Sequence, residues 1–354
     1  MEKTIEKISK YRDALMGVAI LWVMLHHSGL NLPNPFFVVK RSGYCGVDIF
    51  MFVSGLGCAY SLHKNNDVLT FYKRRIKRIF PMYLPILAVF LAMNSTAQSA
   101  AEWARDILGN ITGFSFWAME GTRFNWYLVA IPVFYFMTPI IFDCLKRYRS
   151  YGLTMLLILS FVAGFCFART EDVAIAVYRL PIYVLGVAAG VYMVTSDAGA
   201  KGTNGIAVRI AAYAGGCIGL VLLALMHRYK DVIPVDYYNV FWPCILISIG
   251  LMCLLSRIFE GIEKSKAGKA IVQAFAFLGK LSLELYLIHI VFFGKIGMWI
   301  EGVYDKENPL PFSFKNILIW LMACIVTIAA AYVYGKGINT LAELASKRME
   351  GSKA

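Results

Sequence analysis

Two adjacent histidines near the end of an apolar run are the first candidates for chemistry in this chain. His26 and His27 end a stretch that starts at Arg12 and is long enough to cross a bilayer. An ionisable side chain inside a spanning helix is costly, which makes it a candidate for a functional role. The sequence leaves two interpretations open: a pair at the membrane interface beside lipid headgroups, or a general base inside a helix bundle.

Helical geometry does not select between the two histidines. At 100° per residue, His26 lies about 40° to one side of Arg12 and His27 about 60° to the other. Asp48 opens the next apolar segment and is expected on the same side of the membrane as His27. Its carboxylate would either fix the tautomer of the imidazole or cap the start of its own helix.

A run of cations precedes the third apolar segment. Its members are Lys73, Arg74, Arg75, Lys77 and Arg78. Such a cluster suits a polyphosphate, for example the adenosine end of coenzyme A, and it is also typical of segments that set topology or contact anionic lipids. Arg179, at the mouth of a later segment, would hold an acceptor hydroxyl or an acyl carbonyl, or would anchor its helix by snorkelling.

The composition predicts an all-α polytopic membrane protein. Of its 354 residues 59% are hydrophobic, and the mean hydropathy is +0.61. The eight cysteines are scattered without a CxxC motif, so no metal is expected. The net charge of +13 lies mainly in short loops beside apolar runs, which favours membrane topology over binding of nucleic acid. With no internal repeat or linker, one domain over residues 1–354 is expected.

Ten apolar segments predict a bundle of about ten transmembrane helices. Lys and Arg are about twice as frequent on one side, which predicts that both termini, including the tail 336–354, are cytoplasmic. The connection 94–123 is expected to form a lid or an interfacial helix. Lys280 and Glu284, four residues apart, are expected to pair. The segments are Ala14–Leu30, Tyr44–Leu62, Ile79–Met93, Asn125–Ile141, Tyr151–Phe167, Arg179–Val194, Ile206–Met226, Tyr238–Leu255, Ile271–Phe293 and Asn316–Tyr334.

Six motifs, spread in order over residues 12–293, resemble those of the type 3 acyltransferases. These are integral membrane enzymes that move acyl groups onto extracytoplasmic or membrane-borne acceptors, commonly sugars. The register of the first motif matches His27, not His26, to the family's essential histidine. Met16 stands where the family usually has Arg or Lys, with Arg12 one turn earlier, and Ile131 and Pro132 stand where many members are acidic. The motifs are GVAILWVMLHH, GVDIFMFVSG, RIKRIFP, NWYLVAIPVFYFMTP, YRLPIYVLG and LGKLSLELYLIH.

The resemblance implies an O-acyltransferase of the plasma membrane. The donor would be a cytoplasmic acyl-CoA, most simply acetyl-CoA, and the acceptor a glycan or a lipid-linked sugar. It implies His27 as general base with Asp48, donor binding by Arg12, Arg74, Arg75 and Arg78, and a substrate lining of Trp126, Arg179, Tyr286 and His289. The alternative class is a transporter, flippase or sensing module, which would also carry ionisable groups inside the membrane. A homo-oligomer has no support in the sequence.

Overall fold

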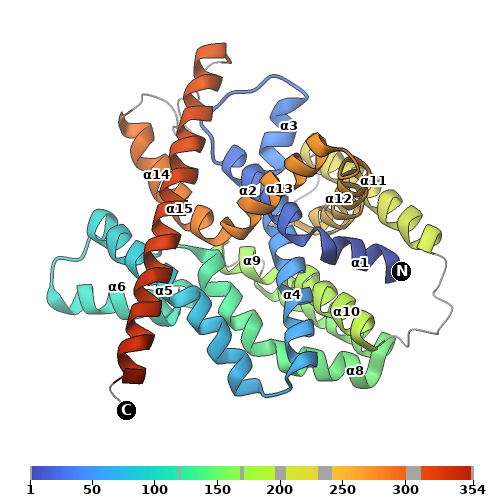
Figure 1. Ribbon diagram of the computed structural model, residues 1–354, viewed down its shortest axis with the longest axis horizontal. Helices are drawn as coiled ribbons and strands as arrows, with labels where there is room; N and C mark the ends of the chain where they lie inside the picture. The colour runs from blue at the N-terminus through green and yellow to red at the C-terminus, as the bar shows by residue number, and fades with distance from the viewer. Residues whose placement is uncertain are drawn as a thin grey trace.

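Every secondary-structure element that the structure describes is a helix, which confirms the predicted all-α class (Figure 1). This computed structural model describes residues 2–118, 121–167, 171–195, 205–229, 241–299 and 312–351. The helices are α1 (Glu2–Lys10), α2 (Arg12–His26), α3 (Phe36–Arg41), η1 (Ser42–Tyr44), α4 (Cys45–Lys64), α5 (Val68–Asn94), α6 (Ala100–Thr112), α7 (Phe114–Trp117), α8 (Trp126–Phe167), α9 (Glu171–Val177), α10 (Leu180–Thr195), α11 (Gly205–Arg228), α12 (Phe241–Ile262), α13 (Lys266–Lys280), α14 (Ser282–Trp299) and α15 (Phe314–Gly351).

Seven of the described helices are long and apolar enough to cross a membrane, or up to eight if the bent pair α13 and α14 is one span. Two features account for the difference between these eight spans and the predicted ten. The fourth and fifth predicted segments lie within α8, which is interrupted at Arg149 by a non-helical backbone (φ 48°, ψ −119°). The first segment forms α2, which has only 15 residues. The number of about ten spans and the cytoplasmic termini therefore stay predictions.

The chain reverses direction within α8. Trp126, on the first arm, lies 4.8 Å from the guanidinium carbon of Arg179. A Cβ on Gly164, on the second arm, would lie 3.6 Å from the ring of Tyr178. Because both arms meet neighbouring residues at the start of α10, they run back alongside each other from the break at Arg149.

Helix α4 lies near the centre of the bundle in Figure 1 and contacts α2, α8, α10 and α12. Its side chains are apolar on nearly every face and most are buried, as expected of a central helix. Two residues along a helix turn a side chain by about 200°, so Asp48 and Phe50 meet different neighbours. Because of this rotation, the carboxylate of Asp48 and the aromatic ring of Phe50 contact different helices.

Helices α2 and α13 touch backbone to backbone. A Cβ added to Gly279 would lie 1.7 Å from the carbonyl oxygen of Asp13, and one added to Gly17 would lie 1.9 Å from that of Phe275. Only glycine permits so close an approach. The contact brings the start of α2, with Arg12, next to Lys280 at the end of α13.

The pairing predicted for Lys280 and Glu284 is wrong. Helices α13 and α14 meet at a bend of 66°, between Lys280 and Ser282. The bend removes the i,i+4 geometry of a continuous helix, and these two described side chains form no ion pair. Glu284 packs against Gly335 of α15 instead, where a Cβ would lie 3.1 Å from its Cγ.

Gly279→Ala is expected to lower the melting temperature of the purified protein by several degrees. The added methyl group would force α2 and α13 apart, and overpacking of this kind costs about 1–3 kcal/mol. Gly337→Ala is the matched control, because a Cβ at Gly337 meets nothing within 4 Å and alanine has the better helix propensity. Equal melting temperatures for the two variants would contradict the close contact.

The connection that holds α6 and α7 is fixed by buried hydrogen bonds. The side chain of Asn110, 3% exposed, donates to the carbonyl oxygens of Asp106 and Thr122, and the Tyr83 hydroxyl donates to the carbonyl oxygen of Asn110. Burial alone would raise the pKa of the Asp106 carboxyl, but hydrogen bonds from Thr122 and Ser95 hold this pKa below its ordinary value. These bonds tie the segment to α5, and the lid or interfacial helix expected of the connection 94–123 stays a prediction.

Candidate functional site

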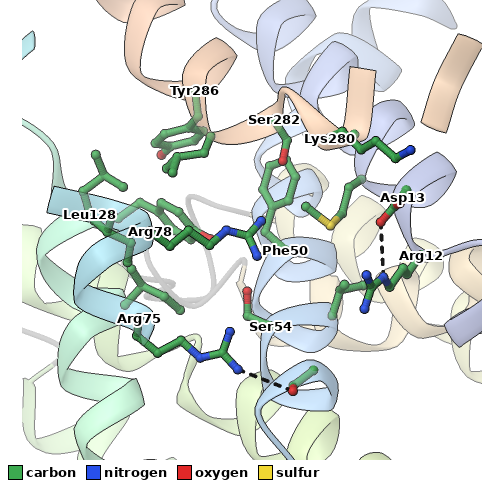
Figure 2. A pocket seen from close by; sticks show the side chains of 18 of the residues that line it. Arg12, Asp13, Phe50, Ser54, Arg75, Arg78, Leu128, Lys280, Ser282 and Tyr286 are labelled. Carbon is green, nitrogen blue, oxygen red and sulfur yellow. Dashed lines mark hydrogen bonds and ion pairs between the residues drawn. The ribbon is translucent and has the colours of Figure 1, made fainter. Parts of the chain in front are cut away.

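A cavity of about 370 Å³ opens among α2, α4, α5, α8, α13 and α14. Its charged lining is mostly cationic, with one carboxylate from Asp13 (Figure 2). The cations come from three separate helices and converge only in the folded chain. The lining consists of Arg12, Asp13, Met16, Phe50, Val53, Ser54, Gly57, Arg75, Arg78, Ile79, Tyr127, Leu128, Ile131, Tyr135, Gly279, Lys280, Ser282, Leu283 and Tyr286.

Three of the four arginines predicted to bind the donor line this cavity. Arg12 pairs with Asp13 at 3.2 Å, and Arg75 donates to the carbonyl oxygen of Gly57 at 3.5 Å. In Figure 2 the guanidinium of Arg78 lies between Tyr286 and Ser54. Arg74 is exposed and does not line the cavity. Arg12, Arg75 and Arg78, together with Lys280, form what we call the cationic rim.

Arg75 is also held by aromatic rings. Its guanidinium carbon lies 5.1 Å from the ring centroid of Phe71 and 5.4 Å from that of Tyr135. Cation–π contacts of this kind fix the orientation of a guanidinium without neutralising it. The charge of Arg75 therefore stays available to an anionic ligand in the cavity.

One face of α2 connects the cavity to the histidine predicted as base. Met16 lines the cavity, and His27 follows eleven residues later, which on a helix is a rotation of only about 20°. His27 directly follows the last residue of α2. The separation along the helix axis is about 16 Å, so the cavity and His27 lie at different depths of the same helix face.

A second histidine hydrogen-bonds His27. The Nε2 atom of His289 lies 3.2 Å from Nδ1 of His27. Nδ1 of His289 lies 2.9 Å from the carbonyl oxygen of Leu285, and Nδ1 of His27 lies 3.0 Å from that of Val23. His289 is fully buried, whereas His27 is half-buried.

These contacts assign the neutral tautomers of both rings. A carbonyl oxygen only accepts, so Nδ1 of His289 carries its proton and donates to Leu285. Nε2 of His289 is then an acceptor, and Nδ1 of His27 carries a proton that is shared between His289 and the carbonyl oxygen of Val23. Nε2 is therefore the basic nitrogen of His27, the arrangement that a general base requires.

Three aromatic rings that contact one another line the cavity, and one of them also contacts His289. Phe50, Tyr127 and Tyr286 all line the cavity, and neither histidine does. The ring of Tyr286 lies 5.5 Å from that of His289, centroid to centroid. Tyr286 thus faces the cavity and also contacts the histidine pair.

Asp48 and Arg179 form a buried pair away from this cavity. The two side chains are 1% and 2% exposed, with Arg179 Nε 3.6 Å from Asp48 Oδ1. Trp126 and Phe241 lie 4.8 and 4.1 Å from the guanidinium carbon. Its burial makes the snorkelling interpretation of Arg179 wrong. Nδ1 of His27, the atom from which a carboxylate that fixes the tautomer would accept, is contacted by the carbonyl oxygen of Val23 and by His289; a role of Asp48 toward His27 stays a prediction.

Sequence reasoning missed several residues of the cavity. Asp13, Ser54, Tyr127 and Lys280 line it, but none was proposed as a site residue. The signal available for Asp13 was its position on the face of α2 that carries Arg12 and Met16. Lys280 was predicted only as the partner of Glu284. The rotation of each helix about its own axis, which sequence spacing does not fix, decides which side chains face the cavity.

Comparisons with known proteins agree with the six motifs. Curated relatives include "Regulator of hypoxia-inducible factor 1" of Caenorhabditis elegans, 29% identical over 44% of this chain and 39% of the relative. Another is "O-acetyltransferase OatA" of Staphylococcus aureus, 25% identical over 36% of this chain and 24% of the relative. The chain thus matches less than half the length of either relative, and no solved structure matches it. A family model described as an acyltransferase domain matches residues 10–336, and the chain therefore belongs to the type 3 acyltransferase family.

Proposed function

We propose that this protein is a membrane O-acyltransferase that takes its acyl group from acyl-CoA and uses His27 as general base. The observation that carries the proposal is the His27–His289 pair, which contacts Tyr286 in the lining of a cavity with a cationic rim. The name of the OatA relative points to acetyl as the acyl group. Acetyl-CoA is therefore the donor that we propose first.

The cationic rim suits the phosphates of coenzyme A. Arg75 and Arg78 come from α5, and Arg12 and Lys280 approach from α2 and α13. Guanidinium groups bind phosphate through two parallel hydrogen bonds, which orients as well as attracts it. The nucleotide would stay at the rim while the pantetheine arm, which carries the thioester, enters the cavity between Arg78 and Tyr286.

The residues present support one balanced reaction. Nε2 of His27 takes the proton of an acceptor hydroxyl while the hydroxyl oxygen attacks the thioester carbonyl. The carbon–sulfur bond breaks, an ester forms, and the proton is returned to the departing thiolate, giving free coenzyme A. A thioester is already activated, so positioning and a base suffice. His289 would act as a positioning residue, because it accepts, together with the carbonyl oxygen of Val23, the proton on Nδ1 of His27.

The acceptor would approach His27 from the side opposite the cationic rim. His27 is half-buried. The loop that follows it leads into α3, which precedes the N-terminal end of α4, whereas the cavity is lined by later residues of α4. We propose that this side is extracytoplasmic, that both termini are cytoplasmic and that the membrane is the plasma membrane. The acceptor is then a hydroxyl of an extracytoplasmic glycan or of a lipid-linked sugar.

Inverted membrane vesicles test the proposed function directly. Vesicles that contain the protein and its native acceptors present the cationic rim to the medium if the proposed topology is right. Added acetyl-CoA should then release free coenzyme A, measured with a thiol reagent, and radiolabel from the acetyl group should appear in vesicle glycan or lipid. Vesicles without the protein provide the background. Uptake of a small polar solute without any release of coenzyme A would instead favour a transporter.

A further inference from the structure

Three side chains that could bind a metal ion meet in the core, where two helices begin. Cys45 and Asp48 lie in the first turn of α4, and Cys244 lies in the first turn of α12. Their two sulfur atoms and a carboxylate oxygen all lie within 4.8 Å of one another. Each of the three residues is at most 1% exposed. We call them the thiol–carboxylate cluster; none of them lines the cavity with the cationic rim.

The fold brings the cluster together although the spacing of its members does not predict a metal site. Cys45 and Asp48 are three residues apart and therefore lie on one face of α4. Helix α12 packs beside α4, where the Ser248 hydroxyl donates to the carbonyl oxygen of Cys45 at 3.1 Å. The lack of a CxxC motif argues only against a local metal site. Cys45 and Cys244 come from separate helices.

The carboxylate of the cluster has one oxygen that is buried without a partner. Oδ2 of Asp48 accepts no hydrogen bond from the residues that the structure describes. The other oxygen, Oδ1, lies 3.6 Å from Nε of Arg179. An unpaired carboxylate oxygen in the interior is costly. A cation bound at Oδ2 would remove this cost, and the pairing of Oδ1 with Arg179 is the kind of outer contact that a ligating carboxylate usually has.

The charges of the cluster suit a divalent ion. A Zn²⁺ ion that binds two cysteines displaces both thiol protons, so the product contains Zn²⁺, two thiolates and the carboxylate of Asp48. This complex carries one net negative charge, which the guanidinium of Arg179 neutralises. The buried cluster is therefore neutral either with two protons or with one Zn²⁺ ion, and neither state leaves an uncompensated charge in the interior. A helix N-terminus also stabilises a thiolate.

We propose that Cys45, Asp48 and Cys244 bind one Zn²⁺ ion, which ties α4 to α12. Two thiolates and a carboxylate are ligands that Zn²⁺ accepts, and a water molecule would complete four-fold coordination. Ca²⁺ and Mg²⁺ prefer oxygen ligands alone, and a monovalent ion such as Cu⁺ would leave one negative charge unbalanced. The proposal does not depend on the proposed function, because it involves neither the acyl donor nor His27.

Metal content tests the proposal. The protein is purified through a tag without histidine, incubated with Zn²⁺ and a reductant, and freed of excess metal by gel filtration. Elemental analysis should find about one Zn²⁺ ion per chain. Loss of an outer partner of a ligand lowers metal affinity by about 10–100-fold, so Cys45→Ser and Cys244→Ser should lower it at least as much. The matched controls are Cys58→Ser and Cys253→Ser, which replace buried cysteines of α4 and α12 outside the cluster.

The controls separate the proposed site from binding elsewhere on the protein. Loss of Zn²⁺ in both cluster variants, with the wild-type content kept by both controls, supports the site. Absence of Zn²⁺ from the wild type, or equal contents in the cluster variants and the controls, would overturn it. A disulfide between Cys45 and Cys244 in cells whose free thiols are alkylated before lysis would also overturn it.

The wild-type protein decides the question if the cluster variants do not fold, which size-exclusion chromatography in detergent detects. X-ray absorption at the zinc edge should then show two sulfur ligands at about 2.3 Å and oxygen ligands at about 2.0 Å. A spectrum with histidine ligands, or with any other number of sulfur ligands, would place the ion elsewhere and contradict the proposal.

Discussion

Replacement of His27 by alanine is expected to lower the rate of acetyl transfer by about 10²–10⁴-fold, the usual contribution of a positioned general base. The variant should still fold, because His27 is half-buried and lies beyond the end of α2, so little core packing is lost. Release of coenzyme A in inverted vesicles measures the effect. A variant that keeps more than about a tenth of the wild-type rate would exclude His27 as the base.

His26→Ala is the matched control for this substitution. His26 is the neighbouring ring, and its Nδ1 lies 3.2 Å from the carbonyl oxygen of Lys40. His26 contacts α3 through Lys40 and packs edge-on against His27, with ring centroids 5.1 Å apart. Because its loss removes packing and leaves the hydrogen bonds of His27 Nδ1 in place, the rate should stay within about threefold of the wild type. A large loss in His26→Ala together with a small loss in His27→Ala would exchange the roles of the two histidines.

Substitutions of His289 separate positioning from packing. His289→Leu removes one of the two acceptors of the proton on Nδ1 of His27 and leaves the carbonyl oxygen of Val23, so kcat should fall by at most about tenfold, the usual contribution of one hydrogen bond. His289→Gln retains an acceptor oxygen and should recover part of kcat, with KM for acetyl-CoA unchanged in both variants. Equal losses in the two variants would indicate that His289 only fills space.

The helical class of the fold could be predicted from composition, because an apolar run of about twenty residues satisfies its backbone hydrogen bonds within a bilayer by forming a helix. The division into spans could not be predicted so well. The break at Arg149 falls in the connection predicted between the fourth and fifth apolar segments. The bend between Lys280 and Ser282 lies inside one predicted segment, where no proline marks it, and it depends on how the neighbouring helices pack.

The candidate site could be predicted in part. Motif register favoured His27 over His26, and the RxxR pattern included Arg75 and Arg78, both of which line the cavity. The sequence left Asp48 either as the partner of His27 or as a cap of its own helix, and its ion-pair partner in the structure is Arg179. The contact of His289 with His27 joins residues 262 positions apart, and spacing carries no information about such a contact.

Arg78→Gln is expected to raise KM for acetyl-CoA by about tenfold and to change kcat little. Loss of one charged hydrogen bond to a phosphate costs about 1.5–3 kcal/mol, and exposure of Arg78 to solvent reduces this cost. The effect lies in KM because the phosphates are bound equally in the ground state and in the transition state. Initial rates in inverted vesicles over a range of acetyl-CoA concentrations measure both constants.

A truncated donor shows whether Arg78 acts through the nucleotide. Acetyl-pantetheine carries the thioester without any phosphate, so KM for this donor should be the same in the wild type and in Arg78→Gln. Arg74→Gln distinguishes the sequence prediction from the cavity, since Arg74 belongs to the same cationic run but lies outside the cationic rim. Arg147→Gln, an exposed arginine of α8, controls for the loss of surface charge. If Arg74→Gln and Arg78→Gln raise KM for acetyl-CoA equally, the cationic run attracts the donor as a diffuse charge, and the cationic rim does not bind its phosphates specifically.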